Sequence, residues 1–327
     1  MKTEVIKNRF PLLSFGFVKA YVITMRPYLM FVSGITGIAG LSFGVMNPIT
    51  FLFLFSAAFL SYGFGQALTD CFQIDTDSIS SPYRLLTKGL VSRNQILFIS
   101  VTGLTYCVSV FSFFNPLNFI LGIISGIGLA TYTPFKRKWW SGPFYNSWIV
   151  GLLFAMSFLS VVKSFPIFHP DKFIFTLGAV FWGYANFVLS GYFKDISADR
   201  ATGYNTLPVV FGRKKSALIS DAFAILTFIF SSAAILIILK NKGNIYSSIS
   251  ILFLIIGVVM SIIAQVRLHL VKNDEEAHYS ISLVVHSYIL FLSAVAASNK
   301  PGWNLFLLVY YLCYLFVLKI RPAKNQI

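Results

Sequence analysis

Two clusters of aspartates stand out among the eleven acidic residues of this 327-residue chain. Asp70, Asp75 and Asp77 form the first cluster, and Asp195 and Asp199 form the second. Hard divalent cations prefer oxygen ligands, and Mg²⁺ is often held by one or two carboxylates together with the phosphates of a substrate. The two clusters therefore predict a magnesium site that takes a diphosphate, provided that the fold brings them together.

The spacing within each cluster favours one helical face. If the helix before the first cluster continues past it, four oxygen-bearing side chains fall on one stripe of that helix. They are Gln66, Asp70, Gln73 and Asp77. The acids of the second cluster are also four residues apart, so two short acidic stripes could face each other across a metal site.

Basic residues are interleaved with both clusters and could bind phosphate oxygens. Arg84 and Lys88 follow the first cluster, and Lys194 and Arg200 flank the second. Arg binds a phosphate group through two parallel N–H groups, whereas Lys contributes a point charge. The basic run at 136–138, between the clusters, is equally compatible with anchoring a helix end at lipid headgroups.

The elements that position these clusters are predicted to be membrane helices. The chain is 57% hydrophobic and only 11% charged, with a mean hydropathy of +0.76. Apolar runs long enough to cross a hydrocarbon core of about 30 Å recur along the sequence. They lie at 28–46, 50–68, 94–113, 117–133, 144–162, 173–191, 217–239, 246–266, 279–297 and 303–318. The predicted fold class is an all-α polytopic membrane bundle of nine or ten transmembrane helices.

The basic residues are divided unevenly between the two ends of this bundle. If all ten segments cross, 21 of the 26 Lys and Arg residues lie on the side of the N-terminus and five on the other side. Cytoplasmic loops are enriched in Lys and Arg, so we expect the N-terminus and the active-site loops to be cytoplasmic, in a bacterial inner membrane. The net charge of +15 then reflects topology, and no nucleic-acid partner is expected because the basic residues do not form one soluble face.

The segments that carry these clusters resemble the UbiA superfamily of intramembrane prenyltransferases. Residues 69–89 read T-D-C-F-Q-I-D-T-D-S-I-S-S-P-Y-R-L-L-T-K-G, similar to the family's N-D-x-x-D-x-x-x-D followed by P-H/Y-R-P-I-x-x-G. Residues 194–212 read K-D-I-S-A-D-R-A-T-G-Y-N-T-L-P-V-V-F-G, similar to K-D-I-x-x-D-x-x-x-G-x-x-T-L-P-V-x-x-G. Tyr132-Thr133-Pro134 with its basic loop, Asn146, and Arg26-Pro27 before the first span also match family segments in the expected order.

The resemblance implies Mg²⁺-dependent transfer of a prenyl group from a polyprenyl diphosphate to a small acceptor, aromatic or lipid-like, within the membrane. It implies that the catalytic metal ligands are Asp70, Asp77, Asp195 and Asp199. It implies that the diphosphate contacts are Arg84, Lys88, Lys194 and Arg200. Tyr132 and Asn146 are candidates for contact with the developing cation or the acceptor. The expected partners are these substrates and membrane lipids, with no obligate protein partner.

The resemblance also predicts the division of the chain. Residues 1–27 are expected to form a cytoplasmic segment, 28–320 a single transmembrane prenyltransferase domain and 321–327 a C-terminal tail. Because the family usually has nine spans, one of the last four is expected to be a partial or surface helix.

Three positions in the first motif depart from the family pattern. Thr69 and Gln73 replace the family's Asn and middle Asp, and Asp75 has no family counterpart. Gln73 can offer an oxygen but no charge, which should weaken one metal site unless a neighbouring acid compensates. The role of Asp75 stays open.

Two alternatives remain at this point. A weakened first motif would also suit a terpene-cyclising relative of the same family. A polytopic transporter would likewise be apolar and helical, but transporters tend to place ionisable residues near the bilayer midplane. Here the acids lie at one predicted face, which favours an enzyme that acts on a lipid diphosphate.

Overall fold

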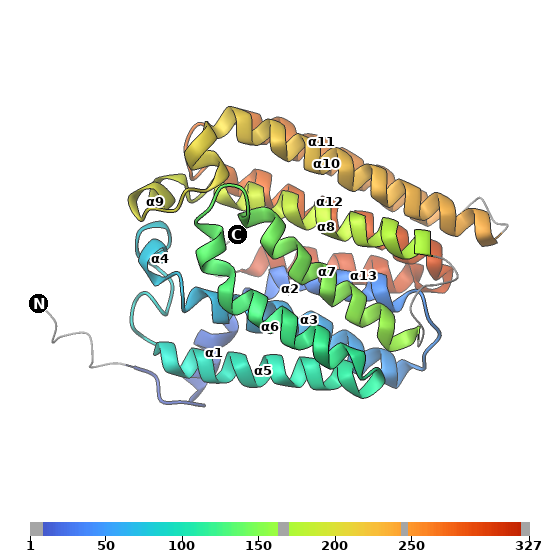
Figure 1. The fold of residues 1–327 in the computed structure, drawn as a ribbon, viewed down its shortest axis with the longest axis horizontal. Coiled ribbons are helices and arrows are strands. Elements are labelled where there is room, and N and C mark those ends of the chain that lie inside the picture. Colours follow the sequence, from blue (N-terminus) through green and yellow to red (C-terminus); the bar gives the residue numbers. More distant parts are fainter. Residues whose placement is uncertain (1–8, 163–169, 243–247, 322–327) are drawn as a thin grey trace, which may run out of the picture.

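The computed structural model describes residues 9–162, 170–242 and 248–321, and every regular element within these ranges is a helix. The helices are α1 (Phe15–Thr24), α2 (Pro27–Leu41), α3 (Pro48–Asp70), α4 (Ile74–Ser80), α5 (Arg93–Phe114), α6 (Leu117–Lys136), α7 (Gly142–Val161), α8 (Pro170–Tyr192), α9 (Ile196–Ala201), α10 (Leu207–Lys242), α11 (Ser248–Leu270), α12 (Ala277–Asn299) and α13 (Asn304–Ile320), with a 3₁₀ turn at Pro301–Trp303. Figure 1 shows the long helices side by side, with α4 and α9 at one end of the bundle. The predicted all-α membrane fold is confirmed. The remaining parts of the predicted terminal segments, 1–8 and 322–327, lie outside the described residues.

Nine helices of the described chain are long and apolar enough to cross a membrane. They coincide with nine of the ten predicted spans. The exception is the first prediction, 28–46, which corresponds to the 15-residue α2 and reaches spanning length only together with α1, from which it is bent by 58°. The expectation that one of the last four spans is partial is wrong, because α10, α11, α12 and α13 with its 3₁₀ turn all reach spanning length. The alternative, that one of them lies on the membrane surface, stays a prediction.

Local sequence signals explain where the helices that carry the site begin and bend. Asn47 caps α3, its Oδ1 accepting the Thr50 N–H at 2.8 Å, and Pro48 takes the first helical position, where a missing N–H costs nothing. Arg26 adopts a φ of +53° at the bend between α1 and α2. The residue before a proline is hindered from helical geometry, so Pro27 favours a break at this point.

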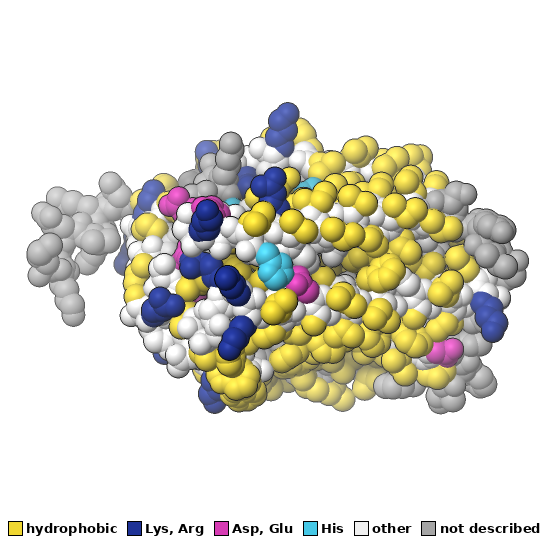
Figure 2. Space-filling view, turned by 90° about the horizontal axis from the view of Figure 1, so that it is seen from above, with side chains coloured by type: hydrophobic (Ala, Val, Ile, Leu, Met, Phe, Trp, Pro, Cys, Tyr) yellow, Lys and Arg dark blue, Asp and Glu magenta, His cyan; other side chains and the backbone are white. Residues whose placement is uncertain are grey.

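The centre of the bundle is α12, which is rich in small residues. About nine-tenths of its most apolar stretch is buried, whereas the corresponding share of α13 is 17%. Small side chains let membrane helices approach closely, and α12 packs against α2, α8, α10, α11 and α13. The outer helices expose apolar side chains instead, and Figure 2 shows an apolar band along the molecule with most of the visible Lys and Arg at one end.

The two acid-bearing segments do not continue their long helices. The helix before the first cluster ends at Asp70, and α4 begins only at Ile74. The helix before the second cluster ends at Tyr192, and α9 begins at Ile196. The continuous stripe predicted from Gln66 to Asp77 is therefore wrong as a helix, because the chain turns over residues 71–73.

Candidate active site

A cavity of about 670 Å³ runs through the bundle between α2, α3, α5, α6, α7 and α8. Its lining on α5 extends from Leu97 to Phe111, which corresponds to about 21 Å along the helix axis. Most of the wall is apolar, and the charged side chains gather at the end next to α4. Asp70, Gln73, Asp77 and Asp195 line that end. The predicted stripe thus reaches one cavity even though a break interrupts its helix.

Two of the three acids of the first motif, Asp70 and Asp77, are held by two arginines. Arg26 Nη2 lies 3.0 and 3.2 Å from the Asp70 carboxylate oxygens, and Gln66 Nε2 donates to Asp70 Oδ1 at 2.7 Å. Arg84 forms a close ion pair with Asp77 and lies 3.6 Å from Asp70. Both aspartates are buried, so their charges are compensated within the protein.

The second motif is arranged differently. Asp195 and Lys194 line the cavity, yet neither side chain makes a hydrogen bond or a short ion pair with any side chain in the described ranges. Asp199 is completely buried and accepts a hydrogen bond from Thr206 Oγ1 at 3.1 Å through Oδ2. Its other oxygen, Oδ1, is also buried and accepts no hydrogen bond from the described residues.

Burial and neighbouring charges shift the protonation of this second motif. Burial lowers the pKa of Lys194 to about 8. Burial also opposes ionisation of Asp195, but the positive charges of Lys194, Lys136 and nearby arginines outweigh it and lower the pKa of Asp195. The pKa of Asp199 is raised to about 7, chiefly by burial, although the charge of Lys136 acts in the opposite direction. An ionised Asp195 therefore faces the cavity.

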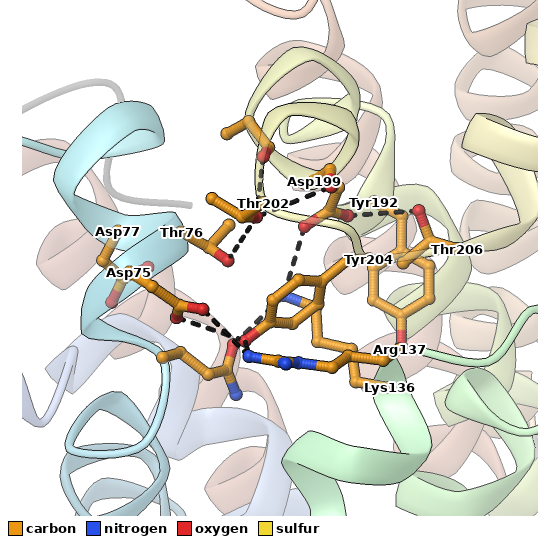
Figure 3. A network of polar contacts seen from close by, with 12 residues as sticks. Asp75, Thr76, Asp77, Lys136, Arg137, Tyr192, Asp199, Thr202, Tyr204 and Thr206 are labelled. Carbon is orange, nitrogen blue, oxygen red and sulfur yellow. Dashed lines mark hydrogen bonds and ion pairs between the residues drawn. The ribbon is translucent and has the colours of Figure 1, made fainter.

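Lys136, at the end of α6, joins the two motifs (Figure 3). Its Nζ donates to Gln73 Oε1 at 3.1 Å and lies 3.9 Å from Asp199 Oδ1. The ammonium also lies over the rings of Tyr192 and Tyr204, at 5.6 and 5.3 Å from their centroids. Sequence reasoning left Lys136 outside the predicted site, although the basic run at 136–138 had marked the segment.

The other predicted site residues divide into two groups. Tyr132 and Asn146 line the cavity, and Tyr132 shares a 3.1 Å hydrogen bond with the hydroxyl of Tyr192. Lys88 and Arg200 are exposed and do not line it. Arg26 lines the cavity but was noticed in the sequence only through the Arg26-Pro27 match.

The donor set suits a metal that shares its ligands with a substrate. Within the described ranges, no three His, Cys, Asp or Glu side chains converge to form a complete metal cage. Mg²⁺ is typically held by one or two carboxylates, substrate phosphates and water. Asp77 and Asp195 line the cavity and are oxygen donors of that kind. The predicted ligand Asp199 does not line the cavity, although its buried Oδ1 accepts no hydrogen bond from the described residues.

Sequence comparison identifies proteins that are similar to this chain. The sequence model of the UbiA prenyltransferase family matches residues 30–284. The digeranylgeranylglyceryl phosphate synthase of Thermococcus kodakarensis is 29% identical over 217 residues, which cover 65% of this chain and 76% of that protein. The synthase of the same name from Pyrococcus abyssi is 24% identical over 301 residues, covering 87% of this chain and 99% of the relative.

Structural comparison gives the same fold. A UbiA homolog from Aeropyrum pernix K1 superposes with a TM-score of 0.68 at 16% identity, covering 81% of this chain and 96% of the other. A UbiA homolog from Archaeoglobus fulgidus bound to GPP and Mg²⁺ superposes with a TM-score of 0.64 at 16% identity, covering 86% of this chain and 99% of the other.

Proposed function

The chain belongs to the UbiA prenyltransferase family, and from this premise we propose that it transfers a prenyl group from a prenyl diphosphate to a lipid-like acceptor that carries a glycerol phosphate. The reaction requires Mg²⁺ and takes place within the membrane. The observation that carries this proposal is a long apolar cavity whose polar end is lined by Asp195 and Lys194, neither of which makes a hydrogen bond or a short ion pair with another side chain of the described ranges.

The cavity matches the two ends of a prenyl diphosphate. Its apolar length along α5 is about 21 Å, and its wall is built mainly of Leu, Val, Ile and Phe side chains. Its polar end carries four cationic side chains, Arg26, Arg84, Lys136 and Lys194. An isoprenoid tail is stabilised by apolar burial, and a diphosphate is stabilised by charge-assisted hydrogen bonds.

The residues of the polar end have separate tasks in the proposed reaction. Asp77, Asp195 and Asp199 would hold the Mg²⁺, and Asp70 would orient Arg26 and Arg84 toward the diphosphate. A Mg²⁺ ion held there would supply positive charge against the negative charge of the diphosphate. Lys136 and Lys194 stabilise the same developing charge. Tyr132 would place its ring beside the allylic carbon, where a partial positive charge develops. The acceptor hydroxyl oxygen then bonds to that carbon and its proton passes to the departing diphosphate.

The proposed acceptor follows from the relatives. The curated proteins described above are named digeranylgeranylglyceryl phosphate synthases. An acceptor with an apolar tail and a phosphate would place its tail against the apolar wall of the cavity and its phosphate near the cationic end. A small aromatic acceptor would leave more of the apolar wall unfilled, so we favour the lipid.

We further propose that the polar end of the cavity lies on the cytoplasmic side. The predicted excess of Lys and Arg lies on that side, and Figure 2 shows these residues gathered at one end of the molecule. Positively charged loops are retained in the cytoplasm. The membrane would be the inner membrane of a bacterium, as predicted, or the corresponding single membrane of an archaeon, from which the relatives named above come.

A turnover assay tests the proposal. The purified protein is supplied with geranyl, farnesyl or geranylgeranyl diphosphate, with and without Mg²⁺, and with glyceryl phosphate lipids or aromatic acids. Diphosphate release that requires both Mg²⁺ and a glyceryl phosphate lipid supports the proposal. Release that requires an aromatic acid corrects the acceptor, and release without any acceptor identifies a cyclase. The absence of both release and Mg²⁺-dependent substrate binding contradicts the function altogether.

A further inference from the structure

The extra acid of the first motif points away from the cavity. Asp75 does not line it, although Asp77, two residues later on the same short helix, does. The carboxylate of Asp75 instead lies 2.9 Å from Arg137 Nη2, and the Tyr204 hydroxyl donates to its Oδ1 at 3.3 Å. The Arg137 guanidinium lies over the Tyr204 ring at 4.5 Å from the centroid. These three residues, shown in Figure 3, are called the latch below.

The latch joins three segments that are far apart in the sequence. Asp75 belongs to α4, Arg137 follows α6, and Tyr204 follows α9. Two further hydrogen bonds tie the same segments. Thr76 and Thr202 share a hydrogen bond at 3.0 Å between their hydroxyls, and the Asn205 N–H donates to the Arg137 carbonyl at 3.0 Å. The segments therefore behave as one polar layer across the end of the cavity.

Resting on the proposed function, we propose that Asp75 is a positioning residue that, through Arg137 and Tyr204, latches α4 against α9 and so sets the spacing between Asp77 and Asp195. The geometry assigns the two acids of α4 opposite tasks. Asp77 faces Arg84 and the cavity, while Asp75 fixes the orientation of the helix that carries both. A helix of seven residues has little stability of its own, so its position depends on contacts of this kind.

Because two of the latch residues are partly exposed, they can be changed to test the positioning role without unfolding the protein. The side chains of Arg137 and Asp75 are 46% and 44% exposed, and ion pairs that are this exposed contribute little to global stability. The ring of Tyr204, by contrast, is fully buried. Asp75 and Arg137 are therefore the residues to change, because their loss should leave the bundle folded.

A kinetic cycle tests the latch. Asp75→Ala, Arg137→Ala and the double variant are compared by thermal melting, by the Mg²⁺ concentration at half-maximal rate, and by kcat and KM for the prenyl diphosphate. We expect either single variant to raise the half-saturating Mg²⁺ concentration and KM by about five- to tenfold, with kcat nearly unchanged, and the double variant to match the singles, because both changes remove one coupled unit. Asp75→Glu should restore much of the lost affinity.

A control variant and a comparison of the two single variants distinguish a positioning role for Asp75 from a role as a metal ligand. Glu275→Ala removes an exposed acid elsewhere in the described chain and should change neither constant. If Asp75 were a metal ligand, Asp75→Ala would abolish turnover while Arg137→Ala would not, which overturns the latch. Additive effects of the two single variants, or no effect of either, also overturn it.

A distance measurement tests the latch without any turnover. Spin labels are attached at Ile79→Cys on α4 and Ser197→Cys on α9, both exposed positions, with the exposed Cys313 replaced by Ser. Asp75→Ala is expected to broaden or lengthen the distance distribution between the labels. An unchanged distribution overturns the latch even if the enzyme is active, whereas a broadened distribution in an inactive protein supports the latch and contradicts only the proposed function.

Discussion

In both halves of the candidate active site, a long helix ends, three residues turn the chain and a short helix follows. The turn spans 71–73 between α3 and α4, and 193–195 between α8 and α9. Gln73 and Asp195 occupy the same position, directly before the short helix, and Asp77 and Asp199 lie four residues further on. The two halves thus share a backbone plan and differ in the side chains placed on it.

The charges of the two halves differ. In the first half, Arg26 and Arg84 compensate Asp70 and Asp77, and the position before the short helix is a neutral Gln. In the second half, that position holds Asp195, which has no short ion pair within the described chain. A substrate complex must rearrange existing ion pairs to use the first half, whereas the second half offers its charge directly. We infer that the second half dominates Mg²⁺ binding.

The largest expected effect comes from removing the unpaired acid. Asp195→Asn should lower kcat/KM by about 10³-fold, because the cavity loses the carboxylate that no short ion pair within the described chain holds back from a metal ion. Asp77→Asn should lower it less, since Arg84 already offsets the charge of Asp77. Steady-state kinetics at saturating Mg²⁺ compare the two variants, with thermal melting as the control for folding. A larger loss for Asp77→Asn would reverse the comparison.

The next effect tests the residue that joins the halves. Lys136→Met should lower kcat by about 10²-fold, because it removes the buried cation that we propose stabilises the departing diphosphate. Its exposed neighbour in the same basic run provides the matched control, and Lys138→Met should leave kcat close to that of the unaltered protein. Equal losses in both variants would mean that the loop acts through its overall charge rather than through Lys136.

A third change makes the first half resemble the second. Gln73→Asp restores an acid at the position that Asp195 occupies in the other half. The half-saturating Mg²⁺ concentration should fall by about three- to tenfold, the effect of roughly 1 kcal/mol of added attraction. Gln73→Asn, which keeps the amide, serves as the control. If Gln73→Asp instead raises the Mg²⁺ requirement, the new carboxylate has been taken up by Lys136 and the first half does not contribute a ligand at this position.

Part of this arrangement could be predicted from the sequence. Hydrophobic runs located nine spans, and acids at helix ends located the cavity, because apolar length and charge are properties of the chain itself. The turn at 71–73 could not be predicted from the sequence, because the spacing from Gln66 to Asp77 fits a continuous helix equally well. Side-chain direction depends on where such a turn falls, which is why Asp75 and Asp77 face opposite ways although both belong to one acidic cluster.

The same dependence explains the basic residues. Lys136 reaches both motifs because α6 ends against them, and its neighbour Arg137 turns outward to Asp75. Spacing in the sequence does not distinguish these two directions, so the prediction gave the run at 136–138 no specific role. It assigned four other basic residues to the diphosphate, of which the structure places Arg84 and Lys194 in the cavity wall.

The smallest expected effects concern the two predicted diphosphate contacts that do not line the cavity, Lys88 and Arg200. Lys88→Ala and Arg200→Ala should each change kcat/KM by less than about twofold, because exposed charges that do not line the cavity are screened by salt. Arg84→Ala and Lys194→Ala, measured in parallel, should show far larger losses. A tenfold loss in Arg200→Ala, sensitive to the prenyl diphosphate concentration, would mean that α9 rotates to bring Arg200 inward when substrate binds. In that case the second half would gain a compensating cation when substrate binds, and the difference between the two halves would become smaller in the complex.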